Sequence, residues 1–181
     1  MSTIDGLPAH ILLVHAVVVL VPLSALLILL VAFWPAARRR LVWPTAILSV
    51  VALIFVPLTT EAGEWLEQRV ARTPLVSTHT EIGDTMLPWA IAMAVVAMVL
   101  LGRHLLGSRR SGGRDAPGAA TATGPGTTSG QPGGTVVTVV VGLLAVVVAA
   151  GSVFTVYRIG ESGARAAWTG QFSQQARVGP P

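Results

Sequence analysis

Three of the four histidines lie at or just before the start of an apolar stretch. His10 and His15 begin the first such stretch, and His79 precedes the third. Imidazole ligates zinc, copper and iron, exchanges protons near neutral pH and holds haem iron. An ionisable side chain inside a membrane span is costly and marks a functional site by default. These histidines are therefore the first candidates for chemistry.

Helix geometry limits how the histidines can cooperate. Residues five apart on an α-helix are turned by about 140° and separated by about 7.5 Å along the axis. His10 and His15 therefore cannot ligate one ion from a regular helix, and each needs a partner from another helix. His79 is the best candidate. Gly83, one turn further on, would let a flat ligand or a neighbouring helix approach closely.

The residues leave three interpretations open. One is a haem b site in which His10 or His15 pairs with His79. Another is a metal or proton site of His15 and His79, with the carboxylate of Glu161 nearby and His10 as a further ligand. In the third, His15 bonds a neighbouring helix, while His10 and His79 lie among the lipid headgroups.

The elements that carry these residues are membrane spans. The chain has 181 residues, of which 52% are hydrophobic and only 11% charged. About 20 consecutive apolar residues cross a bilayer as a helix. We predict an all-α membrane protein, a four-transmembrane-helix bundle with short extracytoplasmic surface helices. The expected spans are residues 8–34, 41–60, 79–106 and 135–158.

The segments between the spans are more polar. Residues 61–74 form an outer amphipathic segment, which either lies on the membrane or extends the second span. Thr78 and Glu81 fit a capping box that would start the third span near His79. Residues 107–134 are rich in Gly, Pro, Ser and Thr and predict a flexible linker. Residues 159–181 form a polar tail, helical through Trp168.

Small residues on two spans predict close helix packing. They recur at helical spacing, which lets membrane helices approach closely. The two predicted stripes are Ala90, Ala94 and Ala97 on the third span, and Ala145, Ala149 and Ser152 on the fourth.

The distribution of arginines predicts the orientation. The segments after the first and third spans contain seven arginines and one acid, Asp115, whereas the other side holds five arginines and seven acids. Cytoplasmic loops are enriched in basic residues. We expect a multi-pass protein of the bacterial cytoplasmic membrane with an inner linker, 107–134, and both termini outside.

Several classes of function are disfavoured. The absence of cysteine excludes disulfides, thiol catalysis and Cys-ligated clusters. No GxSxG, HExxH or phosphate-binding glycine motif is present. The arginines flank the spans, so the orientation of the protein in the membrane explains them better than binding to nucleic acid does. The segment before the first span contains Asp5 and no basic residue, whereas a cleavable signal peptide begins with a positively charged region.

Three segments carry a resemblance to a known family. They are LPAHILLVHAVVVLVP at 7–22, HTEIGDTMLPWA at 79–90 and YRIGESGARAAW at 157–168, and TTEAGEWLEQRVARTP between them is typical of the actinobacterial branch. The chain resembles the domain of unknown function 2231 family of bacterial integral membrane proteins. The resemblance implies four spans with histidines near one face. Many relatives have a Gly-His-x-Gly pattern after the last span, where this chain has Glu161.

Together these observations favour an accessory or binding protein over an enzyme. We expect it to bind haem b or a divalent metal through outer-face histidines. The alternative is a structural or interaction subunit of a membrane complex that needs no cofactor. The expected partners are the lipid bilayer and either another membrane protein or a second copy of the chain.

Overall fold

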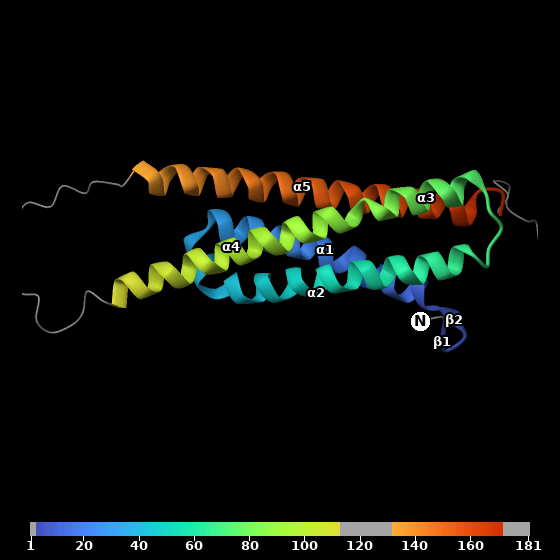
Figure 1. The fold of residues 1–181 in the computed structure, drawn as a ribbon, viewed down its shortest axis with the longest axis horizontal. Helices are drawn as coiled ribbons and strands as arrows, with labels where there is room; N and C mark the ends of the chain where they lie inside the picture. Colours follow the sequence, from blue (N-terminus) through green and yellow to red (C-terminus); the bar gives the residue numbers. More distant parts are fainter. Residues whose placement is uncertain (1–2, 113–131, 172–181) are drawn as a thin grey trace, which may run out of the picture.

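Four long helices lie side by side and a short helix caps one end of them (Figure 1). The computed structural model describes residues 3–112 and 132–171. The helices are α1 (Ala9–Phe33), α2 (Pro35–Glu67), α3 (Pro74–Asp84), α4 (Met86–Gly112) and α5 (Pro132–Trp168). Two short strands, β1 (Thr3–Ile4) and β2 (Leu7–Pro8), precede them.

The spans are long and apolar enough to cross a membrane. They are α1, α2, α3 continued by α4, and α5. Large apolar side chains remain exposed on the outer surface, among them Val19 (63% exposed) and Leu143 (62%). A helix that is apolar on all sides belongs in lipid or in a protein core. The predicted all-α bundle is confirmed, and the protein is a multi-pass membrane protein.

The long helices form a ring in which consecutive neighbours are antiparallel. Extensive contacts join α1 to α2, α2 to α4, α4 to α5 and α5 to α1, while α1 and α4 touch less across the diagonal. Both predicted small-residue stripes are confirmed as buried, since each of their six residues is at most 7% exposed. Packing between small residues therefore closes the ring, because lipid gives no hydrophobic drive for helices to associate.

Prolines and caps set the helix ends at the polar turns. Trp34 alone separates α1 from α2, and Pro35 occupies the first turn of α2, where its missing N–H costs nothing. The predicted amphipathic segment extends α2 as far as Glu67. The next helix begins earlier than predicted: Thr73, not Thr78, is the N-cap, and its side chain accepts a hydrogen bond from the Val76 N–H at 3.3 Å.

A break at Thr85 makes α3 a separate helix. Pro88, in the first turn of α4, has no N–H to offer the preceding turn. The chain turns at Thr85, whose hydroxyl donates to the Ile82 carbonyl oxygen at 2.6 Å. Released from the line of α4, α3 packs mainly on α5. This placement brings His79 to the last turns of α5.

The predicted linker and tail are partly helical. The first residues of the predicted linker extend α4 to Gly112, and its last residues begin α5 at Pro132. Residues 113–131 lie outside the described residues. The tail continues α5 without a break to Trp168, and residues 172–181 are likewise outside them.

The bundle has two chemically different ends. The histidine end carries His10, His79, the α2–α3 connection and the C-terminus of α5 (Figure 1). The arginine end carries the α1–α2 turn with Arg38, Arg39 and Arg40, together with Arg103 of α4. At the histidine end, Asp5 and Gly6 have φ values of 49° and 80° and turn β1 into β2. Asp-Gly favours this kind of tight hairpin turn.

Candidate functional site

Two histidines that are far apart in the sequence meet at the histidine end. The ring centroids of His10 and His79 are 6.3 Å apart, and the ring planes are inclined by 77°. Both side chains are partly buried. His10 comes from the first turn of α1 and His79 from the middle of α3. The predicted pairing of span one with His79 is therefore made through His10.

Helix α2 holds the His10 ring. Its Nδ1 lies 3.0 Å from the carbonyl oxygen of Thr59. Because a carbonyl only accepts hydrogen bonds, Nδ1 is the donor, and in the neutral ring Nε2 then keeps its lone pair. Gly63, one turn later on α2, lies beneath the ring: a Cβ there would be 3.1 Å from both Cε1 and Nδ1 of His10. Glycine at this position therefore lets the ring lie against the backbone.

Helix α5 holds the His79 ring in the same manner. Its Nδ1 lies 3.0 Å from the hydroxyl oxygen of Ser162. That hydroxyl donates its only proton to the carbonyl of Ile159 at 3.0 Å, so it can only accept from His79. A Cβ on Gly163 would come within 3.0 Å of the His79 Cε1. In the neutral form, both imidazoles thus carry the proton on Nδ1 and leave Nε2 free.

His15 is not part of this pair. It is exposed, and its Nδ1 donates to the carbonyl of Ile11 on its own helix at 2.5 Å. The turn of about 140° between positions five apart directs it away from the face that carries His10. The structure therefore places the two histidines of α1 in different surroundings.

Glu161 and Gly83 also lie apart from the pair. Glu161 is exposed and forms an ion pair with Arg165 at 2.6 Å. A Cβ on Gly83 would have no atom within 4 Å, so this glycine makes no close approach. Among the described residues, no group of three or more His, Asp or Glu side chains could hold a metal ion. A joint site of His15, His79 and Glu161 is not assembled.

Sequence reasoning missed the residues that hold the rings. Thr59, Gly63, Ser162 and Gly163 lie on α2 and α5, far along the chain from the histidines they contact. One signal was present, because a glycine inside a helix costs about 1 kcal/mol relative to alanine and implies a packing reason. Both glycines lie inside helices: Gly63 one turn after the acceptor Thr59, and Gly163 directly after the acceptor Ser162.

The arrangement has the features of an imidazole ligand pair. Metal-ligating histidines almost always donate their second N–H to an oxygen acceptor, which fixes the tautomer and raises the basicity of the ligating nitrogen. Both rings have such an acceptor. Helices α1 and α3 make little other contact with each other, so the two rings are the main bridge between them.

Comparison with known proteins adds no relative. No protein-family model, curated protein or solved structure matches this chain. The resemblance described above therefore stays an expectation, and the geometry of the His10–His79 pair carries the functional argument.

Proposed function

We propose that this protein binds haem b between His10 and His79, in the bacterial cytoplasmic membrane with its arginine end toward the cytoplasm. The observation that carries the proposal is the meeting of two imidazoles whose Nδ1 atoms both have oxygen acceptors. In this state each ring has one free ligating nitrogen, Nε2.

The number of ligands favours haem over a bare divalent cation. A protein zinc site uses three or four side-chain ligands, and the described residues contain no such group. Haem would bring most of the ligands of its iron with it and would need only one or two from the protein. Two histidines are therefore a complete set for haem and an incomplete one for zinc.

The two rings are close enough for one bound group to reach both. Their centroids are 6.3 Å apart and their planes are inclined by 77°. A haem held here would take one imidazole from α1, His10, and one from α3, His79.

The protein's own residues would orient and tune the ligands. The Thr59 carbonyl and the Ser162 hydroxyl fix the tautomer of the two rings. Gly63 and Gly163 set the depth of the rings against α2 and α5. Bound haem would supply one-electron chemistry, and the surrounding apolar helices would limit the access of water.

An optical titration tests the proposal. Detergent-purified protein titrated with haemin should develop the Soret and visible bands of six-coordinate, low-spin iron at one haem per chain. His10→Ala and His79→Ala should each abolish the six-coordinate spectrum, because each removes one of the two imidazoles that would hold the haem.

His15→Ala is the matched control, since it removes an imidazole from the same helix without touching the pair. It should bind haemin as the wild type does. The proposal fails if wild-type protein gives only the spectrum of free haemin, or if all three variants bind equally. Metal analysis of the same preparation tests the alternative of a bound divalent ion.

A structural subunit without a cofactor is the second candidate function. Its support is the close fit of each ring on a glycine, which also describes a packing contact that locks α1 and α3 onto the bundle. In that case His10→Ala and His79→Ala should lower the unfolding midpoint of protein that has never met haem, and haemin should not raise it.

A further inference from the structure

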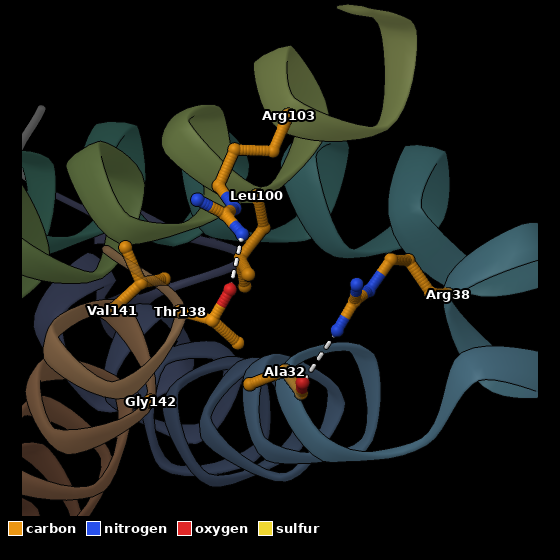
Figure 2. Close-up of a pocket in the computed structure, with 7 residues that line it drawn as sticks. All are labelled: Ala32, Arg38, Leu100, Arg103, Thr138, Val141 and Gly142. Carbon is orange, nitrogen blue, oxygen red and sulfur yellow. Dashed lines mark hydrogen bonds between the residues drawn. The ribbon is translucent and has the colours of Figure 1, made fainter. Parts of the chain in front are cut away.

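The arginine end contains a small, half-open recess between α1, α2, α4 and α5. Its enclosed part has room for about one water molecule, and the rest is open to the surroundings. Its polar lining consists of Arg38, Arg103 and Thr138, and its apolar lining includes Ala32, Leu100 and Val141 (Figure 2). Two cationic groups thus border one recess whose remaining wall is mostly aliphatic.

Arg38 is held by the end of α1. Its Nε and Nη2 donate to the carbonyl oxygens of Val31 and Ala32 at 2.9 and 2.6 Å. These are among the last carbonyls of a helix, which have no partner within it. A guanidinium has five N–H groups, so three of those on Arg38 remain for a ligand.

Arg103 is held from the opposite side by α5. Its Nη2 donates to the Thr138 hydroxyl oxygen at 2.7 Å, and that hydroxyl donates to the Gly134 carbonyl at 2.8 Å. Thr138 is therefore an oriented acceptor that draws Arg103 across from α4. Figure 2 shows the Arg103 and Arg38 side chains extending from different helices toward this recess.

The two charges have no acidic partner. Among the described residues, 3–112 and 132–171, no carboxylate lies within ion-pair distance of Arg38 or Arg103. The ion pair found in these residues joins Glu161 to Arg165, at the opposite end of α5. Placing two partly buried guanidiniums together is unfavourable without a counter-charge. An anion in the recess would supply it.

We propose that this recess binds the phosphate group of an anionic phospholipid. Guanidinium N–H groups match phosphate oxygens in geometry and charge, and basic pockets between transmembrane helices at the cytoplasmic side bind anionic headgroups. The recess lies where apolar spans meet the arginine-rich turn, and its aliphatic wall suits the start of the acyl chains. The same phosphate chemistry could come from free phosphate in solution. The site is remote from the histidine pair and independent of any haem there.

Thermal unfolding in lipid nanodiscs tests the site. Full-length protein in phosphatidylcholine nanodiscs is compared with the same discs containing phosphatidylglycerol, and in a third arm with inorganic phosphate at matched ionic strength. Phosphatidylglycerol should raise the unfolding midpoint of the wild type. In Arg38→Gln/Arg103→Gln the shift should be lost, because the phosphate loses both guanidinium partners.

Arg39→Gln/Arg40→Gln is the matched control, with the same loss of charge at two exposed positions of the same end. It should keep the wild-type response. Because Arg38 also caps α1, Thr138→Val provides a second variant that removes no charge; it should reduce the shift by releasing Arg103 from its acceptor.

The outcomes separate the alternatives. A shift with phosphatidylglycerol alone supports a lipid ligand, and an arginine-dependent shift with inorganic phosphate supports the same site filled from solution. Equal losses in both double variants would show diffuse surface attraction and overturn the proposal. No shift in the wild type, or a full shift in Arg38→Gln/Arg103→Gln, would also overturn it.

Discussion

At the scale of single residues, glycines decide how the two imidazoles are placed. His10 rests on Gly63 and His79 on Gly163, and in each case a Cβ would press on the ring at 3.0–3.1 Å. Real side chains seldom approach so closely, so a methyl group at either glycine must push the ring aside. The position of each Nε2 therefore depends on a residue that carries no functional group.

Gly163→Ala should weaken haem binding and shift its spectrum. The new Cβ displaces the His79 ring from Ser162 by a few tenths of an ångström. Haemin titration measures the change. Gly160→Ala on the same helix is the control, because a Cβ there has open space; it should bind haemin normally and gain up to about 1 kcal/mol in stability from helix propensity. Equal binding by the two variants would contradict this account.

Two buried serines have no hydrogen-bond partner. The hydroxyls of Ser24 and Ser49 are fully buried and unbonded among the described residues. Ser24 lies fourteen residues after His10, and Ser49 fourteen before Gly63, which His10 contacts. Antiparallel helices advance equally per residue, so both serines lie at the same depth in the bundle.

Ser49→Ala should leave stability unchanged or raise it by about 1 kcal/mol, because it removes an unsatisfied buried hydroxyl. Ser152→Ala is the control: its hydroxyl already donates to the Val148 carbonyl at 2.7 Å. Unfolding in mild detergent, followed by tryptophan fluorescence, compares the two. A loss of more than about 1 kcal/mol in Ser49→Ala would mean that the hydroxyl is satisfied in the membrane.

At the scale of elements, one tryptophan fixes the distance between α4 and α5. The Trp89 ring lies directly on Gly151, where an added Cβ would overlap its six-membered ring. The small-residue stripes bring the two helices together, and this contact sets their register. Because α3 precedes α4 directly across the break at Thr85, the same contact indirectly places His79 beside α5.

Gly151→Ala should lower stability by about 1–3 kcal/mol, the usual cost of overpacking a core. The added Cβ would overlap the Trp89 ring, so the ring or the helix must shift. The unfolding midpoint in detergent provides the measurement, with Gly102→Ala as the control, since a Cβ there has open space. A midpoint equal to that of the control would show that Trp89 moves freely.

Sequence patterns predicted the helices better than their boundaries. Hydropathy alone identified four spans. In lipid only a helix, or a closed β-barrel, satisfies all backbone hydrogen-bonding groups, so a single long apolar segment must be a helix. The start of α3 was predicted at the wrong residue. Thr73 and Thr78 both precede helix-forming residues, and Pro74 at the first helical position favours Thr73.

At the scale of the whole molecule, the two ends differ in charge and chemistry. Both described ends of the chain, residues 3 and 171, lie at the histidine end, as four antiparallel spans require (Figure 1). The arginine bias predicts that this end faces outward. The histidine pair would then face the extracytoplasmic side and the proposed phosphate site the inner leaflet.

Single cysteines can test this orientation, because the chain has none of its own. Thr169→Cys lies at the histidine end and Ser108→Cys at the arginine end, and both positions are exposed. In intact cells a membrane-impermeant maleimide should label Thr169→Cys only, whereas permeabilised cells should allow labelling of both. Labelling of Ser108→Cys alone in intact cells would reverse the orientation.

The sequence by itself determined the class of fold, the number of spans and the candidate imidazoles. These properties follow from local composition, because hydropathy and helical period need no knowledge of neighbours. It also showed that His10 and His15 cannot act together, since one helix fixes the angle between them.

Only the tertiary structure decided which histidines meet and what holds them. His10 finds its acceptor 49 residues away at Thr59, and His79 finds its own 83 residues away at Ser162. Such contacts depend on how each helix is rotated and on where α3 breaks from α4. The small-residue stripes indicate which faces of α4 and α5 are buried, but only the packing of the whole bundle decides which helix lies against each face.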